Sequence, residues 1–223
     1  MEKAKRTTVR RSSALTREGI ITAAIEILDT AGETGLTFQS LSKKLKTGPG
    51  ALYWHISDKS DLLAAACDAV IAPKLEIQSV GATPQKIVRD IAGALFDTID
   101  RHPWVGAALI RLPGKMPMVR VLECLGQQVG ALNVPENDQW ILVSTLLMYI
   151  LGVAGQNAAN AQLAQELALE RSHFLNEVST AWSKLPMTGF AFTRSMAARL
   201  QNHNDREDFL SGVDIILRGA KFA

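Results

Sequence analysis

Apolar residues recur every three or four positions along most of this 223-residue chain, which is the spacing of one face of an α-helix. Proline and glycine interrupt the pattern at points that mark helix ends. The alternating β-branched runs that are typical of strands are absent from the sequence. The pattern predicts helices over residues 16–32, 58–72, 84–101, 118–132, 136–160, 161–184 and 205–219, and therefore an all-α protein.

Two shorter helices joined by a tight turn are predicted between residues 37 and 56. Leu41 and Leu45 lie four positions apart and share a face of the first helix. After a break that ends in glycine, Pro49 suits the first position of the second helix, because its φ is already helical. Leu52 and Ile56 face the core, while the small residues at the N-terminus permit close approach to a DNA major groove. The segment is therefore predicted to be a helix-turn-helix.

Candidate DNA contacts follow from the chemistry of this segment. Thr37 caps the first helix and Lys59 opens the next long one, so both lie at amide ends that favour a phosphate. For Trp54, contact with the DNA backbone and packing in the core are both open, and His55 is either a phosphate contact or a non-contacting histidine. The full set is Thr37, Gln39, Gly48, Pro49, Gly50, Ala51, Tyr53, Trp54, His55 and Lys59.

Residues 15–70 resemble the DNA-binding domain of the tetracycline-repressor (TetR) family of bacterial transcription regulators. The matching residues are Thr16, Glu18, Ala23, Ala24, Leu28, Gly32, Gly35, Leu36, Thr37, Leu41, Leu45, Leu52, Tyr53, Trp54, His55, Lys59, Leu62 and Leu63. The closing segment, residues 209–220, is similar to the last helix of the tetracycline-repressor-like subgroup. Lys46 departs from the family, which usually has glycine at this point of the turn. A non-glycine residue in a left-handed conformation costs roughly 1 kcal/mol.

The sequence is predicted to form three regions, and positive charge is concentrated toward the N-terminus. Residues 1–14 are expected to form a basic disordered arm, residues 15–73 the helix-turn-helix domain with its connecting helix, and residues 74–223 a helical ligand-binding and dimerisation domain. Residues 1–60 hold 10 Lys and Arg against 6 Asp and Glu, whereas residues 61–223 hold 14 against 16. The excess of positive charge favours a polyanionic partner for the N-terminal region. The arm either lies along DNA or is a solvated tail.

The predicted helices at 136–160 and 205–219 are apolar over more than one face, which indicates burial on all sides. A second copy of the chain would cover the additional face, and the glycines at positions 152, 155, 212 and 219 permit close helix approach. The sequence therefore favours a homodimer with a four-helix interface. The alternative is one fully buried core without a second copy.

The family resemblance also implies a small-molecule effector inside the second domain. Candidate contacts are polar or aromatic residues in apolar surroundings, namely Trp104, Arg111, Met116, Gln127, Trp140, Ser144, Met148, Tyr149, Asn157 and Trp182. Leu75 and Ile91 stand where polar groups would be expected for magnesium–tetracycline. A hydrophobic metabolite or drug-like compound is the better prediction.

Other classes of chemistry find little support in the sequence. It contains no glycine-rich phosphate loop and no His-x-x-x-His or Cys-x-x-Cys metal spacing, so neither an enzyme nor a metal or other cofactor is expected. Two cysteines, Cys67 and Cys124, are too few for a disulfide framework. Each is expected either to pack in the apolar core or to sense redox state. The apolar stretch from Ile141 to Gly155 is shorter than the about 20 residues of a membrane span. With no secretory signal visible, a cytoplasmic protein is expected.

These observations predict a cytoplasmic transcription regulator, a repressor that binds a palindromic double-stranded DNA operator as a homodimer. A small hydrophobic ligand is expected to release it by shifting the helix predicted at 58–72. Two alternatives stay open: a ligand-independent regulator or activator, and a helical interaction protein that kept a helix-turn-helix fold without binding DNA.

Overall fold

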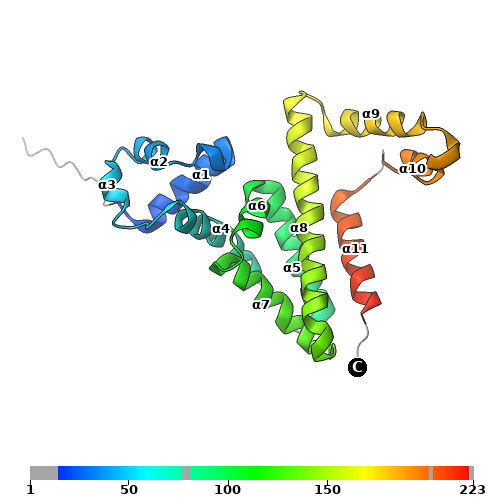
Figure 1. Cartoon of the computed structure of the whole chain (residues 1–223), viewed down its shortest axis with the longest axis horizontal. Helices are drawn as coiled ribbons and strands as arrows, with labels where there is room; N and C mark the ends of the chain where they lie inside the picture. The colour runs from blue at the N-terminus through cyan, green and yellow to red at the C-terminus, as the bar shows by residue number, and fades with distance from the viewer. Residues whose placement is uncertain (1–14, 77–80, 201–202, 221–223) are drawn as a thin grey trace, which may run out of the picture. The chain divides into compact units, whose positions relative to one another are not determined.

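The structure is a computed structural model that describes residues 15–76, 81–200 and 203–220. All the regular secondary structure in these ranges is helical (Figure 1), so the all-α prediction is confirmed. The chain divides into two compact units, Met1–Leu62 and Leu63–Ala223. The predicted basic arm of residues 1–14 lies outside the described residues.

The first unit contains α1 (Arg17–Gly35), α2 (Phe38–Leu45), α3 (Pro49–Leu52) and the start of α4 (Lys59–Leu75). Thr16 caps α1, because its hydroxyl accepts a hydrogen bond from the amide of Gly19 at 3.1 Å. Gly32 interrupts the helix with φ 62° and ψ −170°, a conformation that glycine adopts without steric cost.

The buried face of α1 differs from the predicted stripe. Ala24 and Leu28 are buried as expected, but Ile21 and Ile25 are only half-buried. The neighbouring residues Ile20, Ala23 and Ile27 take their place in the core. Two neighbouring stripes of α1 are apolar. The prediction selected residues at one edge of the buried face, because the sequence alone does not show which of the two stripes faces the core.

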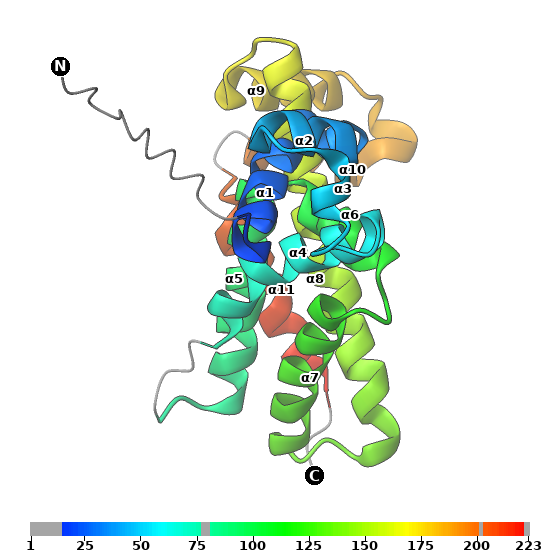
Figure 2. The same ribbon diagram turned by 90° about the vertical axis from the view of Figure 1, so that its left-hand side faces the viewer.

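The second unit contains the rest of α4 and seven further helices in the described ranges. These are α5 (Pro84–Arg101), α6 (Trp104–Arg111), α7 (Met116–Ala131), α8 (Glu136–Glu166), α9 (Arg171–Ser183), α10 (Met187–Leu200) and α11 (Asp205–Gly219). Helix α8 packs against α5, α7 and α11, and α5 also packs against α7 and α11 (Figures 1 and 2). These four helices form the core of the second unit.

Aromatic rings join α11 to the rest of this bundle. Phe209 stacks on Phe96 of α5 at 4.8 Å between ring centroids, and on Tyr149 of α8 at 5.6 Å. The phenol of Tyr149 also donates a hydrogen bond to the carbonyl oxygen of Phe209 at 3.1 Å. A side chain at Gly212 would place its Cβ 1.8 Å from that phenol oxygen, so glycine is required there for α8 and α11 to approach.

Arginine–aspartate pairs add polar contacts between helices of the second unit. Arg120 of α7 donates to Asp68 of α4 with both Nε and Nη2, at 3.0 and 3.2 Å. Arg89 of α5 donates to the carbonyl oxygen of Leu210 at 3.0 Å and forms an ion pair with Asp214 of α11. Such two-pronged pairs fix the relative register of the helices that they join.

Helices α4 and α8 end later than predicted, and a further helix, α10, was not predicted. Helix α4 continues to Leu75, with Pro73 inside its last turn rather than after its end. Helix α8 continues to Glu166, and a turn with Ala168 at φ 52° separates it from α9. The sequence did not predict α10 at all.

The length of α8 also changes one conclusion drawn from the sequence. Over its 31 residues, α8 is long and apolar enough to cross a membrane by length and composition alone. Core helices of soluble proteins meet the same criterion, so the finding is weak evidence for a membrane span. In this structure α8 packs along α5, α7 and α11.

Candidate nucleic-acid interface

The turn between α2 and α3 is built by a capped helix at one end and a left-handed residue at the other. Thr37 and Ser40 form a capping box in which each side chain accepts a hydrogen bond from the amide of the other residue at 3.0 Å. At the end of α2, Lys46 has φ 52° and ψ 44°, and the amide of Thr47 donates to the carbonyl oxygen of Ser42 at 3.0 Å. This hydrogen bond closes α2 as in a Schellman motif. The turn therefore forms although Lys46 replaces the glycine of the family.

Helix α3 is shorter than the predicted eight-residue helix. It spans Pro49–Leu52, and hydrogen bonds from the amides of His55 and Ile56 to the carbonyl oxygen of Leu52 continue it as a turn. The buried side chains Leu52 and Ile56 hold this segment on the core of the first unit. Residues 48–51 are left at the outer end of α3.

The N-terminal end of α3 presents bare backbone to its surroundings. Gly48, Pro49 and Gly50 are exposed, and Ala51 is half-buried. A Cβ added to Gly48 or Gly50 would meet no heavy atom of the described residues within 4 Å, and neither glycine has a positive φ. Packing within the part of the chain that the structure describes therefore does not require glycine at either position. A partner that approaches the backbone closely would supply one.

Two aromatic side chains flank this end. Tyr53 stacks on Phe38 of α2, with 4.6 Å between ring centroids and 16° between ring planes, yet 58% of Tyr53 stays exposed. Trp54 is 89% exposed, which excludes the core-packing alternative for this residue within the described chain. Exposed rings with a polar edge are suited to contact a phosphate backbone.

The remaining candidates divide into exposed and internally bonded residues. Gln39 is exposed on α2, and His55 is half-buried. Lys59 donates from Nζ to the carbonyl oxygen of Glu33 at 2.8 Å, so its ammonium group joins α4 to the end of α1. The carboxylate of Asp58 accepts from the amide of Asp61 at 2.9 Å and thereby caps α4. An acidic cap at this amide end weakens the predicted attraction of a phosphate to Lys59.

The residues predicted to bind a ligand do not form one site. Trp104 is buried, Ser144 and Trp182 are half-buried, and five others are exposed: Arg111, Met116, Gln127, Trp140 and Met148. Tyr149 packs between α8 and α11, as described above. Of the predicted set, Asn157 alone lines a described cleft of the second unit.

That cleft, of about 750 Å³, lies between α5, α8, α9 and the start of α11. Two arginine–aspartate pairs line it. Arg206 donates to both oxygens of Asp97 at 2.7 and 2.9 Å, and Arg171 donates from Nε to Asp205 at 3.0 Å. Sequence reasoning missed these residues because they lie on helix faces that are polar in the sequence and meet only in the fold.

The fold and this interface define a class of protein, a helix-turn-helix DNA-binding unit followed by a helical second unit. Comparison with known proteins gives the family. The profile of bacterial regulatory proteins of the tetR family matches residues 20–66. The solved transcriptional regulator SCO7222, a TetR from Streptomyces coelicolor, is 44% identical over 92% of this chain and 97% of that chain, with a TM-score of 0.82. This chain belongs to the TetR family of transcriptional regulators.

Two curated relatives extend this comparison. An HTH-type transcriptional regulator from Saccharopolyspora erythraea is 35% identical over 94 residues, which are 42% of this chain and 39% of the relative. The HTH-type transcriptional repressor DrrR1 from Streptomyces coeruleorubidus is 28% identical over 181 residues, which are 78% of this chain and 63% of DrrR1. The match thus spans less than two thirds of the length of each of these relatives.

Proposed function

We propose that this protein represses transcription by binding a palindromic DNA operator as a homodimer in the cytoplasm, and that a small molecule releases it. The observation that carries the proposal is the exposed N-terminal end of α3, where two glycines leave the backbone open on a helix-turn-helix. The name of DrrR1 as a repressor supports repression over activation.

The shape of this end fits the floor of a major groove. Small residues at positions 48–51 let the backbone come close to base edges, and the methyl group of Ala51 suits contact with thymine methyl groups. Tyr53 and Trp54 flank the bare backbone and would contact phosphates on either side. Gln39 and the amide end of α2 at Thr37 would add contacts from α2, whereas Lys59 and His55 would have lesser roles.

A homodimer is supported by a stripe of apolar and small residues on the exposed face of α8. Ile141, Thr145, Met148 and Gly152 are exposed and recur at intervals of four, three and four residues, so they lie on one helix face. Ile215 on α11 is 61% exposed. Covering this stripe and Ile215 with the same face of a second copy would give a closed two-fold dimer, which matches a palindromic site.

The cleft between α5, α8, α9 and α11 is the proposed ligand site. Phe96, Phe174 and Leu175 supply apolar walls, and Asn157 donates to Asp100 at its edge with a distance of 2.8 Å. This mixture favours a ligand with an apolar body and polar groups over a purely hydrophobic one. Release requires that the ligand bind one conformation of the protein more tightly than the other.

Binding of the full chain to a random-sequence duplex, measured by fluorescence anisotropy over a range of salt concentrations, tests the DNA-binding part. Affinity is expected to fall steeply with salt, because each phosphate neutralised contributes a slope of about −0.9. Trp54→Ala should weaken binding, whereas Ile110→Ala, at an exposed apolar residue of α6, should not. Absence of salt-dependent binding would favour the interaction protein without DNA binding.

A further inference from the structure

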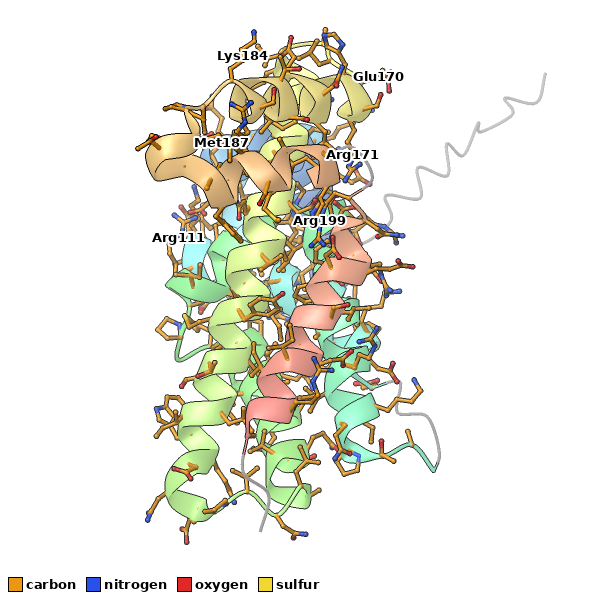
Figure 3. All side chains as sticks on the ribbon, turned by 90° about the vertical axis from the view of Figure 1, so that its right-hand side faces the viewer. Arg111, Glu170, Arg171, Lys184, Met187 and Arg199 are labelled. Carbon is orange, nitrogen blue, oxygen red and sulfur yellow. The ribbon has the colours of Figure 1, made fainter. Side chains whose placement is uncertain are left out.

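Two of the three carboxylates that line the cleft between α5, α8, α9 and α11 are neutralised by arginine. Asp97 on α5 accepts hydrogen bonds from Arg206, and Asp205 at the start of α11 accepts from Arg171. Figure 3 shows the labelled Arg171 at the start of α9, where this helix comes beside α11. Each of the two arginines therefore has a carboxylate partner within the protein.

His203 is the other basic residue of the lining. One of its ring nitrogens lies 3.0 Å from a carboxylate oxygen of Asp205, and the other ring nitrogen faces the carboxylate of Asp208. A proton gained by this imidazole would therefore be balanced by acids of the protein itself. Among the described residues that line the cleft, every basic side chain thus already has an acidic partner.

Asp100 on α5 is the third carboxylate of the lining, and its partner is neutral. The side-chain amide of Asn157 donates to Oδ1 of Asp100 at 2.8 Å. Within the described residues, no lysine or arginine forms an ion pair with Asp100, and its side chain is exposed. A carboxylate offers about four lone-pair sites on its two oxygens, so one amide leaves most of them open. The cleft therefore carries one negative charge without a counter-charge.

The position of Asp100 along its helix is also unfavourable for a negative charge. Helix α5 ends at Arg101, so Asp100 lies in the last turn, where the backbone carbonyl groups already concentrate negative charge. Its neighbour Arg101 lines a separate cleft, together with Val70 and Lys74 of α4. The carboxylate thus stands where its own helix disfavours it. A cationic partner in the cleft would account for a residue that breaks this local rule.

Apolar side chains line the same cleft. Phe96 lies one helical turn before Asp100 on α5, and Phe174 and Leu175 of α9 are half-buried. Phe174 has no aromatic ring partner among the described residues, so its ring faces are open to a ligand. The face of an aromatic ring attracts a cation that lies within about 6 Å. The volume of about 750 Å³ is within the range of sites for organic molecules.

We infer that the ligand of this cleft is an organic cation, with an amine or onium group held by Asp100 and an apolar body against Phe174 and Leu175. The inference rests on the ligand site proposed above and deepens it. An anionic ligand would have to break an arginine–aspartate pair to find a partner, because both arginines of the lining are engaged. A neutral ligand would leave the charge of Asp100 without a counter-charge.

Isothermal titration calorimetry of the full chain with two ions of the same shape and opposite charge tests this inference. Tetraphenylphosphonium is the cationic probe, and tetraphenylborate is the anionic one. Asp100→Asn removes the charge and keeps the shape of the side chain. The variant should bind tetraphenylphosphonium about tenfold more weakly and tetraphenylborate equally or more tightly. Asp90→Asn, at a carboxylate of α5 that is not part of this lining, should change neither affinity.

Phe174→Ala shows whether the two ions occupy the cleft. It removes part of the apolar wall, so both ions should bind more weakly to this variant. Thermal unfolding checks that each variant folds. Asp100→Asn should be at least as stable as the parent, because it removes a negative charge from the last turn of α5.

Failure of tetraphenylphosphonium to bind, or equal binding of it by the parent and Asp100→Asn, would overturn the cationic class. The proposed ligand site would still stand if Phe174→Ala weakened the binding of tetraphenylborate. Binding of both ions that Phe174→Ala leaves unchanged would overturn the cleft as the ligand site as well.

Discussion

Single residues determine the local geometry of the DNA-binding unit, and Lys46 is the clearest of them. Its left-handed backbone closes α2 at the point where the family usually has glycine. The turn depends on the backbone conformation of Lys46, and the lysine side chain is exposed. The turn thus tolerates a residue that disfavours its conformation.

Lys46→Gly should therefore raise the free energy of unfolding by about 1 kcal/mol, because glycine adopts a positive φ without a clash of Cβ. Urea unfolding measures the change. Lys46→Ala is the matched control, since it removes the same charge and keeps Cβ. Equal stability of the two variants would show that the left-handed conformation is not the cause.

Gly50 tests whether close approach to a partner explains the bare backbone of α3. Gly50→Ala meets open space in the chain, so stability should stay the same or rise by up to about 1 kcal/mol. DNA affinity should fall, because the new methyl group lies between the backbone and the groove. Gly126→Ala in α7, another position with open space, should leave DNA affinity unchanged. Unaltered binding by the Gly50 variant would remove α3 from the interface.

Cys67 gives the protein a dependence of stability on pH. Burial, with a smaller effect of the neighbouring Asp68, raises the pKa of this thiol from 9.0 to about 12. The folded chain keeps the proton that the unfolded chain loses near pH 9. The resulting stabilisation is complete below pH 9 and is lost between pH 9 and 12, at about 1.4 kcal/mol per pH unit.

The stability advantage of the parent over Cys67→Ala should therefore shrink from pH 8 to pH 10. Urea unfolding of both proteins at the two pH values measures it, and other titrating groups cancel in the comparison. A pH-independent difference would contradict the account. The buried, protonated thiol favours a packing role for Cys67 over redox sensing.

At the scale of whole elements, the contact between α8 and α11 depends on one glycine. Gly212→Ala should lower the free energy of unfolding by about 1–3 kcal/mol, because the new Cβ would overlap the ring of Tyr149. The ring has little freedom to move away, since it stacks on Phe209 and donates to its carbonyl oxygen.

A double-mutant cycle with Tyr149→Ala measures this overlap, as most of the cost of Gly212→Ala should disappear once the ring is absent. Gly130→Ala in α7 has open space and serves as the control. Additive effects of the two substitutions would mean that the ring and the glycine do not compete for the same space.

The long helices could be predicted from apolar spacing and proline, and α5 and α11 lie where the sequence placed them. Helix α10 could not be predicted in this way. Gly189 bends it, and its apolar side chains are exposed instead of repeating along a buried face. The ten DNA-contact candidates lie on or beside the helix-turn-helix, since they are close in sequence. The ligand candidates are scattered, because their meeting depends on how distant helices pack.

At the scale of the whole molecule, the proposed function involves three surfaces: the outer end of α3, the α8–α11 face, and the cleft beside α9. Helix α4 begins in the first unit and continues in the second without a break. A shift of α4 driven by ligand would thus be transmitted to the DNA-binding unit. Weakening DNA binding about a hundredfold requires roughly 2.7 kcal/mol of coupling.

Selection of bound sequences from a pool of random duplex DNA tests the central claim most directly. The account predicts enrichment of an inverted repeat whose half-sites are centred about one helical turn apart, as two copies of α3 require. Gly50→Ala should lose the enrichment, and Gly126→Ala should keep it. Failure to enrich any sequence, or enrichment of a single unrepeated site, would contradict an operator read twice by a symmetric pair.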